Sequence, residues 1–304
     1  MEQKKIDFFI IGAQKAGTTS LYEYLKSCEK QLHLPLVKEV MDFSNPNLSL
    51  KQIEKNIPGY FTSYNSNPRI KGIADVRSLF MANISAENIY KHNPDAKIIV
   101  LLRDPIDRAI SSFKFSIRNQ LEDVMDLKTV FINEKDRIKE LSKVDQLSRT
   151  YFEVSKYSDQ LPYFVNLFKA NIHYIIFDDL IEDPIGQTKS TLEFLGINDS
   201  SILKEEVFDK KFNVGGSVRN KSIARLFNRK NLLKELYKYL PLPLRMKIRN
   251  SVLNPLLKRN YTNEQMKIEI PKSTELELRQ LFTSEVEKLE VITKLNLKEK
   301  WGYS

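Results

Sequence analysis

Apolar residues gather in three short runs along the chain: Phe8 to Ile11, Ile98 to Leu102, and Tyr174 to Phe177. Each run has the length of a buried strand and is followed by a turn signal or a charged residue. A helical pattern of apolar residues comes next. Strands that alternate with helices are typical of a parallel sheet covered by helices, so we expect an α/β fold.

Two of the covering helices can be placed on the sequence. Leu21, Leu25 and Cys28 recur at helical spacing after the first run. After the third run, the segment "IEDPIGQTKSTLEFLGI" predicts a helix that starts at Pro184 and ends at Gly196. Proline is favoured in the first turn of a helix and glycine just after the last. Both helices could cover the sheet.

The composition supports one globular domain spanning residues 1–304, since 41% of the 304 residues are hydrophobic. The single cysteine, Cys28, excludes an internal disulfide and a multi-cysteine zinc site, and favours a reducing compartment. The apolar run at the N-terminus is too short for a signal peptide, and no run reaches the roughly 20 residues of a membrane span. We therefore expect a cytoplasmic protein.

The positive charge is concentrated in residues 209–260, which hold 14 lysines and arginines and two acids, a net +12 within a chain of net +9. We expect a basic helical subdomain at the C-terminal side of the fold. Its mixture of apolar and basic residues suits three uses: peripheral contact with an anionic membrane, a cleft for an acidic polysaccharide, or ordinary helices with solvated cations. No nucleic-acid module accompanies the charge, so nucleic acid is not an expected partner.

A glycine loop follows the first apolar run. The spacing Gly12-x-x-x-x-Gly17 allows a tight turn, and the backbone N–H groups of Gly17, Thr18 and Thr19 can then bind an oxyanion at a helix N-terminus. A nucleoside-triphosphate loop carries lysine directly after the second glycine, where this chain has Thr18. The remaining alternative is a turn that binds nothing.

The lysine of this segment, Lys15, stands within the loop itself. From there its ammonium could lean over the outer end of a bound phosphate and neutralise charge on a leaving oxygen. Such a position suits a donor that ends just beyond a 5′-phosphate.

A second anion site is expected after the second apolar run. Arg103 emerges at the carboxyl end of that strand, and Ser111 follows eight residues later on a helix that Pro105 can start. A planar guanidinium and a hydroxyl could together bind a second phosphate. Alternatively, Arg103 pairs with Asp104 or Asp107.

A third candidate lies in the basic segment, in "KKFNVGGSVRNKS". Gly215 and Gly216 make the backbone flexible beside Arg219 and Lys221, so this loop could close around an anion. Alternatively, it is a solvated loop.

In this combination the chain resembles the sulfotransferases that use 3′-phosphoadenosine-5′-phosphosulfate (PAPS), particularly the branch of the heparan sulfate sulfotransferases and their bacterial relatives. The matching segments follow one another in order: "GAQKAGTTSL", "KEVMDF", "LLRDPIDRAISSF", "SKYSDQLPYF", "FDDLIEDP", "FLGI", "NVGGSVRNKS" and "LFTSEVEKLEVI". The first and third are the most specific.

The resemblance implies a role for each matching position. Lys15 stabilises the bridging oxygen as sulfonate departs, Arg103 and Ser111 bind the 3′-phosphate, and no metal is required. The implied cofactor-binding residues are Lys15, Ala16, Gly17, Thr18, Thr19, Ser20, Arg103, Ser111, Tyr157, Gly216, Ser217 and Arg219.

The family's base is the glutamate of its Lys-Glu motif, which corresponds to Glu39. A carboxylate there can accept the proton of an attacking hydroxyl. Alternatively, Glu39 is a surface carboxylate paired with Lys38 or another cation. A separate rival for the base is His33, because histidine titrates near neutral pH. His92 and His173 fit a helix end and a strand edge instead.

The resemblance predicts transfer of sulfonate from PAPS to a hydroxyl, or less readily an amine, of a carbohydrate-containing acceptor. Two departures concern the acceptor: Met41 and Asp42 precede the single aromatic Phe43, and "DVRS", Asp75 to Ser78, replaces a usual Ser-Pro-x-Tyr. The rivals are a P-loop kinase using ATP and Mg²⁺, and a non-catalytic protein that binds anions or membranes.

Overall fold

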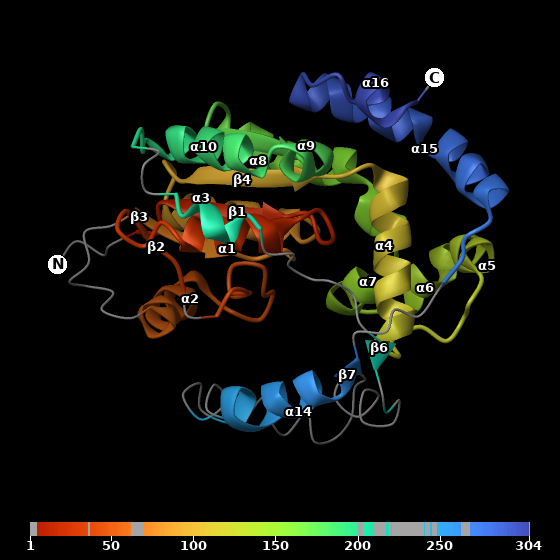
Figure 1. Ribbon diagram of the computed structural model, residues 1–304, viewed down its shortest axis with the longest axis horizontal. Helices are drawn as coiled ribbons and strands as arrows, with labels where there is room; N and C mark the ends of the chain where they lie inside the picture. Colours follow the sequence, from red (N-terminus) through yellow and green to blue (C-terminus); the bar gives the residue numbers. More distant parts are fainter. Residues whose placement is uncertain are drawn as a thin grey trace. The chain divides into compact units, whose positions relative to one another are not determined.

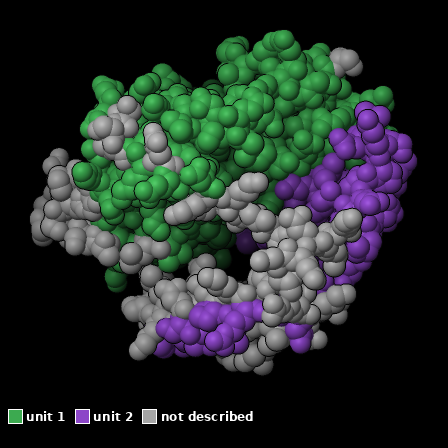
Figure 2. Space-filling view, in the orientation of Figure 1, with its two compact units in different colours: residues 1–108, 154–213, 277–304 green, residues 109–153, 214–276 purple. Residues whose placement is uncertain are grey.

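The computed structural model describes residues 5–35, 37–61, 70–199, 203–209, 217–218, 220, 240, 244, 248–262 and 268–303. The chain forms two compact units, which Figure 2 distinguishes by colour. The first comprises residues 1–108, 154–213 and 277–304, and the second comprises residues 109–153 and 214–276. Most of the expected site residues belong to the first unit.

A five-stranded parallel sheet forms the centre of the first unit (Figure 1). Its order is β2-β3-β1-β4-β5, and the register places Phe8 of β1 opposite Gly72 of β3 and Lys97 of β4. The residues of β1 are buried throughout, which accounts for its unbroken apolar sequence. The strands are β1 (Phe8–Gly12), β2 (Leu32–His33), β3 (Ile70–Ala74), β4 (Lys97–Leu102) and β5 (Ile172–Ile176).

Helices flank this sheet. Helix α3 (Ala82–His92) packs beside α8 (Tyr157–Phe168), and α1 (Thr18–Lys26) packs beside α10 (Pro184–Leu195). The connections through α3 and α8 run across the sheet in one direction, and the connection through α1 runs in the other. Because crossovers between parallel strands are right-handed, α3 and α8 cover one face of the sheet and α1 covers the opposite face. The other α-helices that the structure describes with residues in this unit are α2 (Leu50–Asn56), α4 (Pro105–Arg118), α9 (Phe177–Glu182), α15 (Lys272–Thr293) and α16 (Leu297–Trp301).

The expected α/β fold is confirmed, with one correction to the third strand. The first two apolar runs form β1 and β4, but β5 begins at Ile172 and ends at Ile176. Phe177 is instead the first residue of α9, where Asp178 and Asp179 in the first turn favour a helix N-terminus. The predicted helices α1 and α10 are both present, and Gly196 ends α10 with a left-handed φ of 89°.

The second unit is mainly helical in its described part. Helices α5 (Leu127–Ile132), α6 (Glu134–Glu140) and α7 (Lys143–Arg149) follow the last turns of α4, and α14 (Asn254–Arg259) lies later in the chain. Two buried carboxylates hold the first group: Glu122 pairs with Arg137, and Glu134 accepts hydrogen bonds from the backbone after α7. The short strands β6 (Ser217–Val218) and β7 (Tyr261–Thr262) pair antiparallel.

Much of the basic segment, residues 209–260, lies outside the described residues, including Gly216 and Arg219. The predictions of a basic helical subdomain and of a single domain spanning the chain therefore stay predictions. Among the residues that the structure describes, no helix combines the length and apolar character needed to cross a membrane.

Candidate functional site

The glycine loop, residues 12–20, connects the end of β1 to the first turn of α1. Gly12, Lys15 and Gly17 all have positive φ angles, of 138°, 70° and 88°. A Cβ atom on Gly17 would lie 3.0 Å from the ring of Phe177 and 3.2 Å from Leu180, so both conformation and space require glycine there. The loop therefore has the tight turn that the sequence predicts.

The first turn of α1 offers backbone donors to a ligand. The first N–H groups of any helix have no partner within the helix. Among the described residues, no side chain caps this terminus and no acidic residue stands in its first turn. Thr18, Thr19 and Ser20 are the first three residues of this nine-residue helix, and the side chain of Thr18 is buried beside them. The terminus therefore suits an oxyanion, and oxyanion binding there stays a prediction.

Arg103 reaches the glycine loop from the end of β4. Its Nη1 donates a hydrogen bond to the carbonyl of Lys15 at 3.3 Å, and its guanidinium lies 4.5 Å from the ring centroid of Phe177. Within the described part of the chain its buried Nε has no hydrogen-bond partner. A buried donor of this kind is costly unless a ligand or solvent satisfies it. Arg103 and the loop therefore form one cationic edge.

The alternative pairing of Arg103 with the neighbouring aspartates is wrong among the described residues. Asp104 and Asp107 pair instead with Arg279 of α15, at 2.6 and 2.7 Å. Asp104 also accepts hydrogen bonds from the backbone N–H groups of Ile106 and Asp107, so it caps the start of α4. Neither aspartate therefore neutralises Arg103, whose guanidinium contacts the glycine loop.

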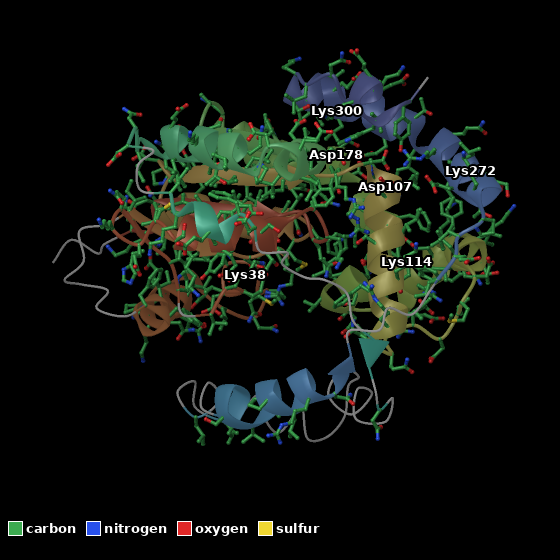
Figure 3. The ribbon with its side chains drawn as sticks, viewed as in Figure 1. Lys38, Asp107, Lys114, Asp178, Lys272 and Lys300 are labelled. Atoms are coloured by element: carbon green, nitrogen blue, oxygen red, sulfur yellow. The ribbon has the colours of Figure 1, made fainter. Side chains whose placement is uncertain are left out.

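Glu39 lies beside the carboxyl end of β3, close to the same loop. Its backbone bridges to Ala74, and its Oε2 accepts a hydrogen bond from the N–H of Val76 at 3.1 Å. Its Oε1 pairs with Lys38, whose Nζ also lies 3.4 Å from Oγ1 of Thr18. Figure 3 labels Lys38 near α1. The sequence alternative of a Lys38 pair is therefore present, but the pair is sheltered, with side chains 16% and 22% exposed.

The DVRS turn, residues 75–78, positions the N–H of Val76, which donates a hydrogen bond to Glu39. The buried carboxylate of Asp75 accepts hydrogen bonds from Ser44 at 2.5 Å, Ser78 at 2.9 Å and the N–H of Arg77 at 3.0 Å. Burial raises the pKa of Asp75 to about 6, although these hydrogen bonds and Arg77 oppose the rise. The turn therefore holds the N–H of Val76 toward Glu39.

Arg77 connects this turn back to the Lys-Glu segment. Its Nε donates to Oγ of Ser44 at 2.9 Å, and its Nη2 donates to the carbonyl of Met41 at 2.5 Å. The two departures from the family pattern, residues 41–43 and 75–78, therefore contact each other. Their altered sequences belong to one hydrogen-bonded network.

One of the three histidines, His92, packs against Phe43 of this network, with ring centroids 5.3 Å apart. His33 is buried in β2 opposite Lys71, three residues before the Ala74 position where Glu39 joins β3, which is about 10 Å along a strand. Its ring packs against Phe61 at 4.9 Å. His92 ends α3 and His173 stacks on Phe194 in the edge strand β5, both as expected. The geometry thus favours Glu39 over His33 as the base.

The remaining predicted residues fall into two groups. Tyr157 is fully buried at the start of α8, where burial raises its pKa and the charges of Arg108 and Arg103 oppose the rise. It would support Arg103 from inside the protein. Ser111 lies on α4 in the second unit, and the backbone of Ser217 lies in β6, so their roles beside the glycine loop stay predictions.

Sequence reasoning did not identify several residues that shape this site. Phe177 lies against both Gly17 and Arg103. Asp75 and Ser44 hold the DVRS turn by a hydrogen bond. Arg279 pairs with Asp104 and Asp107, which would otherwise compete for Arg103. The departure at "DVRS" was a signal for Asp75. The others come from distant segments and have no local pattern.

Comparison with known proteins identifies the family of this chain. The family described as "Sulfotransferase domain" matches residues 5–275. The chain is 26% identical over 208 residues to the heparan sulfate glucosamine 3-O-sulfotransferase 3B1 of Mus musculus, covering 67% of this chain and 47% of that protein. It is 31% identical over 116 residues to the membrane-associated sulfotransferase kil1 of Dictyostelium discoideum, covering 37% of this chain and 23% of that protein.

A solved structure supports the fold as well. The crystal structure of a sulfotransferase from Alicyclobacillus acidocaldarius aligns with a TM-score of 0.56 and 27% identity, over 67% of this chain and 88% of that one. The chain spans about half or less of the length of the two curated relatives named above. Because the family match extends over most of the sequence, the chain belongs to the sulfotransferase family, whose enzymes take their sulfonate group from PAPS.

Proposed function

We propose that this protein transfers the sulfonate group of PAPS to a hydroxyl of a carbohydrate-containing acceptor. The observation that carries the proposal is the meeting of the glycine loop with Glu39: Lys38 contacts both Thr18 of the loop and the Glu39 carboxylate. An anion site and a candidate base therefore lie within one lysine side chain of each other.

The described residues fit an anionic donor. The N-terminus of α1 presents backbone donors with no acid in its first turn. Arg103 contacts the loop through Nη1, and among the described residues its buried Nε has no hydrogen-bond partner. PAPS, when bound, supplies an activated sulfur with a phosphate as leaving group. Residues 17–20 would hold its 5′-phosphate, and Arg103 its 3′-phosphate. The sequence spacing adds Ser111, and the resemblance adds Gly216, Ser217 and Arg219.

The chain's own groups divide the transfer between them. Glu39 takes the proton of the acceptor hydroxyl as that oxygen forms its bond to sulfur. Lys15 stabilises the electron pair that the bridging oxygen retains when its bond to sulfur breaks. Holding both reactants in line reduces the entropic cost of their encounter. The proposed step needs no metal ion.

The acceptor class is supported by the relatives that act on heparan sulfate glucosamine. A free hydroxyl of a polysaccharide or glycolipid fits an enzyme whose base is a carboxylate. An amine acceptor is the second candidate. Peripheral contact with an anionic membrane is a further proposal, which rests on the charge of residues 209–260 and on the membrane-associated relative.

Nucleotide binding tests the proposal before any acceptor is known. Thermal unfolding would be followed with 3′-phosphoadenosine-5′-phosphate (PAP), with ADP, and with ATP plus Mg²⁺. A ligand at 100 times its Kd adds about 2.7 kcal/mol to the free energy of unfolding. We expect PAP to raise the unfolding midpoint well above the effect of ADP, because only PAP carries the 3′-phosphate.

The other outcomes contradict the proposal. Stabilisation by ATP that requires Mg²⁺ would favour a P-loop kinase. No stabilisation by any nucleotide would show that the glycine loop and Arg103 do not form the donor site. If PAP binds but no sulfonate is transferred from PAPS to any polysaccharide or glycolipid tested, the non-catalytic alternative gains support.

A further inference from the structure

Lys38 lies between the glycine loop and the candidate base, Glu39. It precedes Glu39 in the chain, yet its Nζ also lies 3.4 Å from Oγ1 of Thr18, 20 residues earlier. Thr18 is the first residue of α1, directly after the left-handed Gly17. The ammonium of Lys38 is therefore held at the helix terminus where the glycine loop presents its backbone donors.

The surroundings of Lys38 differ from those of a surface lysine. Its side chain is only 16% exposed, whereas Lys91, which pairs with Glu87 on α3, is 56% exposed. A sheltered ammonium is screened less by water and salt than an exposed one. Lys38 thus brings an effective positive charge to a site that already contains Lys15 and Arg103.

The ammonium also has capacity for a ligand. A lysine ammonium has three N–H donors and no acceptor. Two of them account for the contacts with Thr18 and Glu39, so a third can reach a ligand oxygen. The other carboxylate oxygen of Glu39 is bound by the N–H of Val76, which keeps the pair in place.

We propose that Lys38 is a catalytic residue that binds oxygens of the sulfonate during transfer, while Lys15 serves the bridging oxygen. This inference rests on the proposed function. The contact runs between the base and the loop, which is where the sulfonate must pass from donor to acceptor. An ammonium in that position stabilises the charge of the moving group without entering any covalent step.

A simpler role is that Lys38 acts only through Glu39, as a positioning residue. The two roles predict different effects of Lys38 on the binding of PAPS and PAP. A lysine that binds the sulfonate affects PAPS more than PAP, because PAP lacks that group. A lysine that only orients Glu39 affects neither nucleotide.

The test compares the Kd of PAPS with the Kd of PAP by titration calorimetry. The variants are Lys38→Met, which keeps length without charge, and Lys38→Arg, which keeps the charge. Lys91→Met is the matched control, because it removes a lysine from an exposed pair. We expect Lys38→Met to raise the Kd of PAPS about tenfold and the Kd of PAP by no more than about twofold. Lys38→Arg should recover much of the loss, and Lys91→Met should change neither.

The same variants in a Glu39→Gln background separate the two roles. If Lys38 binds sulfonate, Lys38→Met still weakens PAPS selectively when Glu39 is replaced. Equal changes for both nucleotides, or no change in either, would overturn the inference while leaving PAP binding by the wild-type protein intact. Failure of the wild-type protein to bind PAP would instead overturn the proposed function itself. PAP binding by each variant also shows that the variant is folded.

Discussion

The glycine loop and the DVRS turn flank Glu39 and Lys38, but they are built in different ways. The loop is made by the backbone: positive φ angles at Gly12, Lys15 and Gly17 bring it to the terminus of α1. The DVRS turn is made by side chains, because Asp75 ties it to Ser44 and to its own residues. The loop offers main-chain N–H groups to a ligand, and the DVRS turn offers one main-chain N–H group, that of Val76, to the proposed base Glu39.

This difference predicts unequal sensitivity to change. Backbone donors at a helix terminus stay in place when neighbouring side chains vary, and they do not titrate. The turn depends on a carboxylate that is fully buried and whose pKa burial raises to about 6. Donor binding should therefore tolerate many substitutions, whereas the placement of Glu39 should respond to single substitutions and to pH. Each region also contacts an arginine: Arg77 is hydrogen-bonded within the network, whereas the Nε of Arg103 has no partner among the residues that the structure describes.

The largest expected effect comes from Glu39→Gln, which removes the proposed base and keeps the shape of its side chain. We expect kcat to fall on the order of 100-fold to 10,000-fold, since the hydroxyl proton then has no acceptor. The Kd of PAP should change by less than about twofold, because the glycine loop is intact. Transfer of labelled sulfonate from PAPS to heparan sulfate, or to another acceptor on which the wild-type enzyme is active, measures the first quantity.

Two further variants make that result specific. Glu87→Gln removes an exposed carboxylate of α3 and should leave kcat unchanged. Lys15→Ala, in the loop, should also lower kcat strongly, because it removes the lysine proposed to stabilise the charge that develops in the transition state. A Glu39→Gln enzyme within threefold of the wild-type kcat would exclude Glu39 as the base.

A second prediction concerns pH and the DVRS turn. The pKa of Asp75 is about 6 in the folded protein against an ordinary value of 3.8, so the folded state retains a proton that the unfolded chain loses. The stabilising effect of that proton is fully present below pH 4 and is lost as the pH rises through 6. Relative to Asp75→Asn, which cannot titrate, the wild-type protein should lose up to about 3 kcal/mol of unfolding free energy between pH 4 and pH 7.

Urea unfolding of both proteins across that range measures the difference, in which the other titrating groups cancel. Asp95→Asn is a control on an exposed aspartate. A difference that stays constant, or that grows as the pH rises, would show that Asp75 is ionised throughout and that its hydrogen bonds outweigh burial.

The sequence predicted the glycine loop because the loop depends on neighbouring residues. Strand, glycine spacing and helix follow one another within about 20 residues, and each has a local signal. Arg103 was predicted for the same reason, as a residue at the end of an apolar strand. The strand β3 was missed because Lys71 and Gly72 interrupt its apolar pattern, and β2 because it has only two residues.

The DVRS turn could not be predicted in this way. Asp75 and Ser44 are 31 residues apart, and Arg77 and Ser44 are 33 residues apart, so no local pattern relates them. The role of Glu39 came from a family resemblance; without it, a surface carboxylate paired with Lys38 or another cation was the default interpretation. Only the fold shows that this pair is sheltered and reaches Thr18.

The smallest expected effect is that of Phe177→Leu, at the residue whose ring lies against Gly17 and Arg103. The guanidinium of Arg103 lies 4.5 Å from the ring centroid, a cation–π contact worth about 0.5–1 kcal/mol at a partly exposed site. Leucine keeps apolar support beneath Gly17 but removes the ring. We expect the Kd of PAP to rise about twofold to fivefold by calorimetry, and Phe177→Tyr, which keeps the ring, to bind like the wild-type protein. Because Arg103 retains its hydrogen bond to Lys15, a much larger loss would mean that Phe177 shapes the loop itself, and the loop would then depend on side chains as the DVRS turn does.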